Sequence, residues 1–310
     1  MDLVKSAVIV TIVAILLGAL LIPAINDATE DVSIVDIIIV DGQSNAEDWA
    51  SFSTIINSEY SATPAEDLYY YGSPTSTTHY TDSAATIATY GIQPMYSDNK
   101  WVIGGYGPVL CNQYAAKNGH DVCYINIGRS GQSITALLPS ASIGSWGFDI
   151  VDKAITALRS DYDKLNMIGW IWAQGEADKN MAIDTYTADF KIIQSKFGTY
   201  GLNDCYIIHT REYYGGNATE AQAAIAESES NVVMTCLFTE KFTESGGELQ
   251  SGDPIHYTQK GRNIIAAELA SVIPNKTVSI PSLDLLQVIP FVIIAAVLVS
   301  MAAVVIRSKQ

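Results

Sequence analysis

A serine stands in a polar turn directly after an apolar run of β-branched residues. The run IIIV ends at Val40, and the turn DGQSN that follows contains Ser44. A serine hydroxyl becomes a useful nucleophile when a base takes its proton, and a carboxylate commonly orients that base. Ser44 could therefore attack an acyl carbonyl if a histidine and an acid lay beside it. These residue types are also common in turns that have no catalytic role, which is the alternative interpretation.

One histidine is better placed than the others to act as that base. His256 follows Asp253 by three residues in the stretch SGDPIHYTQKGR. An aspartate at this spacing in a tight turn can reach the Nδ1 side of the imidazole, which leaves Nε2 free to face Ser44. Asp253 could instead cap the helix that follows it. The other histidines lie in a loop-like stretch or in and beside apolar runs: His79, His120 and His209.

A tetrahedral intermediate also needs hydrogen-bond donors for its oxyanion. Glycines at strand ends let backbone N–H groups approach a small substrate. The candidate donors are the amide of Ser44, the amide of Gly131 in GRSGQS, and the side chain of Gln174 in QGEAD. GRSGQS could equally be a plain loop between a strand and a helix.

Other chemistries find little support in the sequence. The cysteines and histidines lack the CxxC or HxxxH spacing of zinc sites, and no GxxxxGK[ST] or GxGxxG motif indicates a nucleotide. We therefore expect neither a metal nor an organic cofactor. The formal net charge of −16 argues against nucleic acid as a partner, because phosphate binding needs a basic face.

Five apolar runs predict the strands that must position these residues. Most are continuous rather than alternating, which is typical of strands covered on both faces. The segments between them predict amphipathic helices. Strand and helix in alternation indicate a five-stranded parallel sheet in a three-layer α/β/α sandwich, whose functional groups gather at the carboxyl ends of the strands. The strands begin near Ser33, Asp121, Met167, Cys205 and Val232, and the helices cover residues 108–119, 149–162, 182–198 and 258–273.

Two apolar segments lie outside this predicted domain, which covers residues 31–274. Residues 285–306 are long enough to cross the ~30 Å hydrocarbon core of a bilayer as a helix. Basic residues in the tail at 307–310 would keep it in the cytoplasm and the middle of the chain outside. Residues 1–28 read as a signal sequence, a second anchor or, from VKSAVIV, a pilin-like leader. A buried core helix is the alternative for both segments, and residues 275–284 read as a linker.

Three further features leave alternatives open. Residues 47–101 are rich in Ser, Thr, Tyr and Gly and predict an elaborated surface loop with small strands, which carries substrate contacts or decorates the surface. NAT at Asn217 and NKT at Asn275 fit the glycosylation sequon. Four cysteines allow three pairings, and their apolar contexts suit buried thiols equally well. The pairs considered are Cys111 with Cys123 and Cys205 with Cys236.

The chain resembles the SGNH/GDSL hydrolase superfamily, and within it the sialate O-acetylesterase-like, carbohydrate-acetylesterase branch. Four sequence blocks carry the resemblance in the family's order: GQSN (42–45), RSGQSI (129–134), WAQGEAD (172–178) and DPIH (253–256). They cover about residues 35–270, and both apolar ends fall outside. Ser130 stands where the family usually has a glycine.

The resemblance implies a flavodoxin-like SGNH hydrolase fold and a set of residue roles. Ser44 would be the nucleophile, His256 the general base and Asp253 its orienting acid. Gly131 and Gln174 would complete the oxyanion hole with the Ser44 amide. The residues in supporting positions are Gln43, Asn45, Glu176 and Asp178. The last two would brace a loop by hydrogen bonds rather than move protons.

Together these observations predict a membrane-anchored extracellular serine esterase that removes O-acetyl groups from carbohydrate, on a cell surface or a virion envelope. Its partners would be an O-acetylated glycan, with the sugar unspecified, and a membrane. Two alternatives remain. One is a glycan-binding protein on a hydrolase fold, and the other is a thioesterase or lipase-like acyl hydrolase. The polar, Tyr-rich insertion argues against an acyl tunnel.

Overall fold

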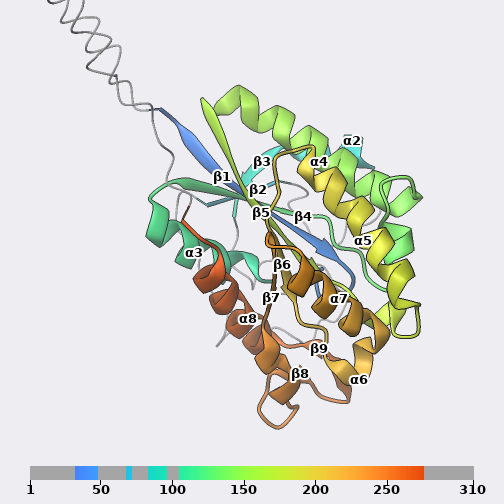
Figure 1. Ribbon diagram of the computed structural model, residues 1–310. Helices are drawn as coiled ribbons and strands as arrows, with labels where there is room; N and C mark the ends of the chain where they lie inside the picture. The colour runs from blue at the N-terminus through green and yellow to red at the C-terminus, as the bar shows by residue number, and fades with distance from the viewer. Residues whose placement is uncertain (1–31, 48–67, 72–82, 96–104, 276–310) are drawn as a thin grey trace, which may run out of the picture. The chain divides into compact units, whose positions relative to one another are not determined.

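The computed structural model of this chain describes residues 32–47, 68–71, 83–95 and 105–275 (Figure 1). The apolar segments at 1–28 and 285–306, the tail, His79, nearly all of the linker and most of the insertion at 47–101 lie outside these residues. Among the helices that are described, none combines the length and the hydropathy that a bilayer crossing requires.

One mixed sheet runs through the domain in the order β3-β2-β4-β1-β5-β6-β7 (Figure 1). Its central strands β4-β1-β5-β6-β7 pair in parallel and are the five that the sequence predicts. β2 extends the sheet in parallel beside β4, and β3 pairs antiparallel with β2 at the edge. The strands are β1 (Ile34–Gly42), β2 (Leu68–Tyr71), β3 (Ile92–Pro94), β4 (Asp121–Asn126), β5 (Lys164–Ala173), β6 (Cys205–Ile208) and β7 (Val232–Thr235).

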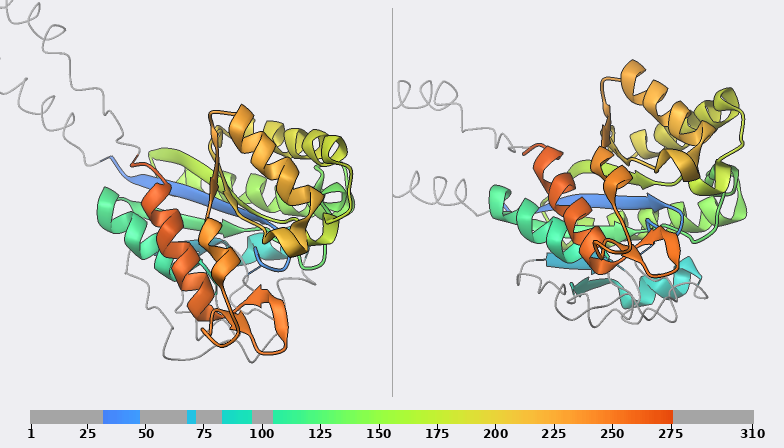
Figure 2. Two further views of the ribbon diagram at one scale, coloured as in Figure 1. Left: turned by 60° about the horizontal axis from the view of Figure 1, so that its bottom comes forward. Right: turned by 90° about the horizontal axis from the view of Figure 1, so that it is seen from below.

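Helices cover both faces of the sheet, which gives the predicted three-layer α/β/α sandwich (Figures 1 and 2). α2, α4, α5 and α7 share one buried cluster, and α3 and α8 share the other. The helices are α2 (Ala84–Tyr90), α3 (Gly107–Asn118), α4 (Ser142–Asp161), α5 (Ile183–Gly198), α6 (Glu212–Gly215), α7 (Asn217–Ser228) and α8 (Gln259–Val272).

β1 shows why its sequence is a continuous apolar run. Ile37 and Ile39 belong to the cluster under α4 and α5, while Ile38 and Val40 belong to the cluster under α3 and α8. Successive side chains of a strand point to opposite faces, so the stretch of a strand that has helices on both sides favours apolar residues at consecutive positions, as from Ile37 to Val40. Each fully buried side chain of this kind contributes about 1.5–3 kcal/mol. This central strand ends at the turn that carries Ser44.

The helix α7 has no counterpart among the predicted helices. It begins at Asn217, the asparagine of the NAT sequon, whose Nδ2 donates to Met181 O at 3.0 Å. Its sequence NATEAQAAIAES is rich in alanine, the residue with the highest helix propensity. The parallel strands β6 and β7 need a crossover between them, and α7 supplies it.

The four cysteines are free thiols, so neither considered disulfide forms. All four are buried in the two apolar clusters. Burial raises the pKa of Cys123 and of Cys236 to about 12, because the thiolate would lose its hydration. These thiols are therefore apolar core residues rather than nucleophiles.

Candidate active site

Ser44 lies in a tight turn at the carboxyl end of β1. The amides of Ala46 and Glu47 both donate to Gln43 O, at 2.9 and 3.1 Å, which closes one helical turn around the serine. Gly42 precedes this turn with φ +138°, and a Cβ there would lie 2.2 Å from the carbonyl oxygen of Ala173. Only glycine fits this backbone conformation and this close approach, so Gly42 sets the direction in which the turn leaves the sheet.

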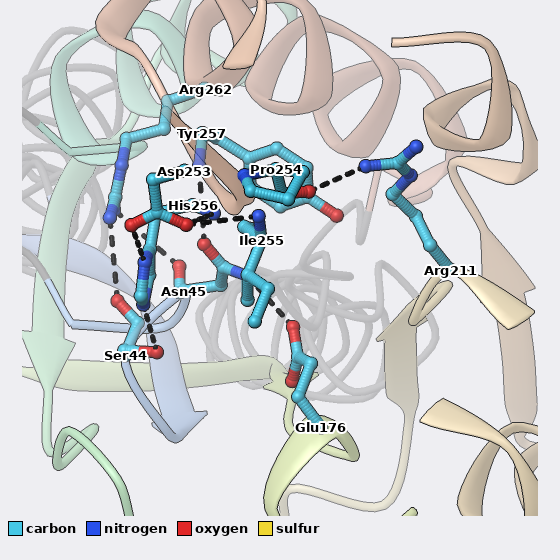
Figure 3. Close-up of polar contacts among 10 residues, drawn as sticks. All are labelled: Ser44, Asn45, Glu176, Arg211, Asp253, Pro254, Ile255, His256, Tyr257 and Arg262. Carbon is cyan, nitrogen blue, oxygen red and sulfur yellow. Dashed lines mark hydrogen bonds and ion pairs between the residues drawn. The ribbon is translucent and has the colours of Figure 1, made fainter. Parts of the chain in front are cut away.

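The structure brings Ser44, His256 and Asp253 into one hydrogen-bonded chain (Figure 3). His256 Nε2 lies 2.8 Å from Ser44 Oγ, and His256 Nδ1 lies 2.6 Å from Asp253 Oδ2. Asp253 and His256 both lie in β9 (Asp253–Tyr257), a short strand that pairs antiparallel with β8 (Leu249–Gln250). With Nδ1–H donating to the carboxylate, Nε2 is an acceptor for the serine hydroxyl.

Asp253 is held as a carboxylate. Its partial burial acts to raise its pKa, but the hydrogen bonds from His256 and from the amide of Ile255 outweigh this and lower it. Asp253 Oδ1 accepts from the amides of Ile255 and His256 at 3.0 and 3.3 Å. It does not cap α8, because that cap is Thr258, whose side chain accepts from Gly261 N at 3.2 Å. The helix-cap interpretation of Asp253 is therefore wrong.

The other described histidines bind carboxylates elsewhere. His209 Nε2 lies 2.8 Å from Glu240 Oε1, and His120 Nδ1 lies 3.4 Å from Asp36 Oδ1. Within the described ranges, His256 is thus the histidine that hydrogen-bonds to Ser44.

Asn45 ties the serine turn to the strand that carries the base. Its Nδ2 donates to Glu176 Oε1 at 2.8 Å and to Ile255 O at 3.2 Å, and its Oδ1 accepts from Tyr257 N at 3.4 Å. One side chain therefore holds the residues on both sides of His256 (Figure 3). Burial raises the pKa of Glu176, although the hydrogen bond from Asn45 acts in the opposite direction.

The loop that contains Gly131 runs beside the end of β1, where Arg129 N donates to Gly42 O at 2.9 Å. Gly131 is exposed and has φ +70°, with no atom within 4 Å of the place where a Cβ would lie. Ser130 needs no such angle, since Cys236 is the one non-glycine residue of the described segments with positive φ. A serine at this position is therefore compatible with the backbone of this loop.

Gln174 is buried, and its amide is oriented by other side chains. Its Oε1 accepts from the Tyr186 hydroxyl at 2.9 Å, and its Nε2 donates to Asp178 Oδ2 and, at 3.3 Å, to Gln132 O. The Gln132 carbonyl adjoins Gly131, so Nε2 faces the same loop. An oxyanion would have to replace Gln132 O, the acceptor at long distance.

Two of the expected supporting residues join the loops around the site. Asp178 Oδ2 also accepts from Ile134 N at 2.7 Å, so this carboxylate links the loop after β4 to the loop after β5. Burial raises the pKa of Asp178. Gln43 Oε1 accepts from the amides of Gly175 and Ala177, at 3.3 and 3.1 Å.

Two arginines at the site were not predicted. Arg211, after β6, donates through its guanidinium to Pro254 O at 2.6 Å and so holds β9, the strand that contains Asp253 and His256 (Figure 3). Arg262, in α8, is 1% exposed and reaches the serine turn. Arg262 had a signal in the sequence, because GRNIIAAELA places it on the apolar face of its helix. Arg211 had none.

Across the described parts of the chain, no group of three or more His, Cys, Asp and Glu side chains is arranged to hold a metal ion.

Comparisons with known proteins show the fold. No protein-family model and no curated protein matches the chain in sequence. A solved structure of an Arabidopsis thaliana protein is similar with a TM-score of 0.56 and 13% identity, over 77% of this chain and 97% of that one. A carbohydrate acetylesterase from Xanthomonas citri has a TM-score of 0.47 and 14% identity, over 77% and 56%. A Bacillus subtilis protein has a TM-score of 0.36 and 14% identity, over 78% and 56%. The first similarity shows a shared α/β fold, and the two lower scores add nothing to it.

Proposed function

We propose that this protein is a serine esterase of the SGNH type that removes O-acetyl groups from carbohydrate. The observation that carries the proposal is the chain from Ser44 through His256 to Asp253, with hydrogen bonds of 2.8 and 2.6 Å at the carboxyl edge of a parallel sheet. The α/β/α fold agrees with it. The substrate class follows from the resemblance of the four sequence blocks.

The proposed reaction uses His256 twice. Ser44 Oγ attacks the acetyl carbonyl while His256 Nε2 takes the hydroxyl proton, and Asp253 stabilises the imidazolium that forms. The tetrahedral intermediate collapses when His256 gives this proton to the sugar oxygen, which leaves as an alcohol. Water then attacks the acetyl-Ser44 ester and gives a proton to His256, which returns it to Ser44 Oγ as the second tetrahedral intermediate collapses and acetate is released.

The oxyanion would take its hydrogen bonds from three donors. The N–H of Ser44 belongs to the turn itself, and the N–H of Gly131 lies in the exposed loop beside it. Gln174 Nε2 would exchange its 3.3 Å contact with Gln132 O for the oxyanion, while Tyr186 and Asp178 keep the amide oriented. Such donors stabilise the transition state because they are already in place when the charge develops.

The proposal includes an anchor. Residues 285–306 would span the membrane, with residues 31–274 outside the cell or on a virion envelope and residues 307–310 inside. The length of the apolar run and the basic residues Arg307 and Lys309 support this orientation. Residues 1–28 would be a signal sequence or a second anchor.

The test is release of acetate from an aryl acetate and from a panel of O-acetylated glycans by the full chain in detergent. We expect Ser44→Ala and His256→Ala each to lower kcat by about 10⁴-fold or more with an unchanged circular dichroism spectrum. Activity of Ser44→Ala at the wild-type rate would contradict the mechanism.

The same assay separates the two alternative functions. Tight retention of a glycan by the wild type without acetate release would favour a glycan-binding protein. A preference for long-chain esters over acetates would favour a lipase-like acyl hydrolase.

A further inference from the structure

The carbonyl oxygens of residues 44–47, in the turn that carries Ser44, accept hydrogen bonds from buried side chains. In a helical turn the carbonyl groups point one way and the N–H groups the other, and the carbonyls at its end lack partners within the turn. Here the four consecutive carbonyl oxygens of residues 44–47 each accept a hydrogen bond from a side chain of another element. The donors are Arg262, Tyr106 and Asn126.

Arg262 supplies most of these bonds. One guanidinium nitrogen, Nη2, lies 3.4 Å from Ser44 O, and the other, Nη1, lies 3.4 Å from Asn45 O and 3.1 Å from Glu47 O. Figure 3 shows its side chain reaching from the helix above to the backbone of Ser44. The planar guanidinium of an arginine presents five N–H donors in a fixed fork, which suits it to bind several neighbouring carbonyls at once.

The two other donors complete the arrangement. The Tyr106 hydroxyl donates to Asn45 O at 2.6 Å, and its ring lies 5.4 Å from the guanidinium carbon of Arg262. Asn126 Nδ2 donates to Ala46 O at 2.8 Å. The turn is thereby held by the residue that directly precedes α3, by β4 and by α8 together.

Burying a guanidinium has a large desolvation cost, which must be offset by its contacts. Arg262 is 1% exposed and lies on the same buried helix face as Ile265 and Ala266. An apolar residue would pack there without that cost. The contacts with the turn that carries the nucleophile therefore give a reason for an arginine at this position.

Arg262 also belongs to the helix that directly follows the base. His256 lies in β9, and α8 begins at Gln259, so one short segment carries both the base and the arginine that holds the nucleophile. The position of Ser44 Oγ relative to His256 Nε2 is thus set in part by one continuous segment that runs from β9 into α8.

We propose that Arg262 is a positioning residue for the esterase reaction, which holds the turn by its carbonyl oxygens so that Ser44 Oγ stays within hydrogen-bond reach of His256. This inference rests on the proposed function. A positioning role differs from a merely structural one in a measurable way. A structural arginine would change the fraction of folded molecules, whereas a positioning arginine changes the rate of each folded molecule.

The test compares the full chain with its Arg262→Lys and Arg262→Met variants. Active serines are counted by stoichiometric labelling with a fluorophosphonate, and kcat for an aryl acetate is expressed per labelled serine. We expect Arg262→Lys to lower this kcat by about 10–100-fold, with KM within about twofold, because small misplacement of reacting groups is costly. Arg262→Met, without charge or donors, should be slower still.

Arg159, exposed in the last turn of α4, provides the matched controls Arg159→Lys and Arg159→Met, with wild-type kinetics expected.

A wild-type kcat per labelled serine in both Arg262 variants would overturn the inference. If these variants do not fold, Tyr106→Phe tests the same point, since it removes one donor to Asn45 O and keeps the ring. We expect it to lower kcat per labelled serine by about 3–10-fold, and an unchanged value would count against the inference. Fluorophosphonate labelling requires only a serine activated by a base, so its rate reports on the position of Ser44 even if the wild type releases no acetate. Failure of the wild type to release acetate would contradict the proposed function but not the inference about Arg262.

Discussion

Asp41 is a buried acid three residues before Ser44, the proposed nucleophile, and has no part in the proposed reaction. It is 2% exposed, and its Oδ1 accepts from Gly42 N at 2.7 Å. Burial raises its pKa to about 8, because the hydrogen bond from Gly42 offsets only part of the lost hydration. The carboxyl is therefore protonated in the folded protein at neutral pH.

This state makes stability depend on pH. Between the ordinary pKa of 3.8 and about 8, the folded chain holds a proton on Asp41 that the unfolded chain has released. Stability therefore falls as pH rises through this range, by about 1.4 kcal/mol per pH unit.

Asp41→Asn keeps an acceptor for Gly42 and cannot ionise, so we expect its stability relative to the wild type to increase from pH 5 to pH 8. Urea unfolding at both pH values measures the gain, with the exposed Asp184→Asn as the control. An equal difference at pH 5 and pH 8 would show that Asp41 does not titrate in this way.

The end of β1 approaches the end of β5 so closely that the last residue of β1, Gly42, can only be a glycine. A Cβ at Gly42 would lie 2.2 Å from the backbone oxygen of Ala173, whereas a Cβ at Gly119, which also has positive φ, would have no atom within 4 Å. Gly119→Ala should therefore cost only about 1 kcal/mol of stability, because alanine disfavours the positive φ at this position. Gly42→Ala should cost roughly 3–5 kcal/mol, because the two strand ends must separate. Denaturant unfolding of both variants measures the costs, and equal losses would contradict the close approach.

The central strands were predictable, because helices on both faces demand a continuous apolar run, as in β1 and β5. The strands β2 and β3 lie in the insertion, where the sequence predicted small strands but not their positions, because LYYY and IQP are short and carry no such pattern. The crossover helix α7 was missed for another reason. Two adjacent parallel strands require a crossover, but NATEAQAAIAES contains one large apolar residue and so does not mark a buried helix face.

The sequence was also sufficient to name the three residues that meet at the site, because serine, histidine and aspartate have distinctive spacing at predicted strand ends. It could not show what holds them. The contact of Arg211 with Pro254 joins segments 43 positions apart, and the contact of Arg262 with Ser44 joins segments 218 apart. Such contacts depend on tertiary placement, and only the position of Arg262 on the apolar face of its helix is visible in the sequence.

Residues Ser33–Lys276 form a compact unit that contains both buried clusters and the whole candidate site. Every hydrogen bond from Ser44 to Asp253 and the contacts of Arg262 lie within it. We therefore expect this unit, produced alone, to unfold cooperatively and to keep the kcat per labelled serine of the full chain. The activity and the proposed anchor would then belong to separate parts of the molecule.

That separation predicts where each form of the protein is found in the cell. The full chain should sediment with membranes and be released by detergent but not by high salt, because a spanning helix is held by burial of apolar surface. A chain that lacks only residues 285–310 serves as the matched control, and the unit 33–276 should remain in the supernatant. The last comparison also tests the first 28 residues, since retention of the control on membranes would make them a second anchor. Recovery of the full chain in the supernatant would contradict the proposed anchor and leave the chemistry at Ser44 untouched.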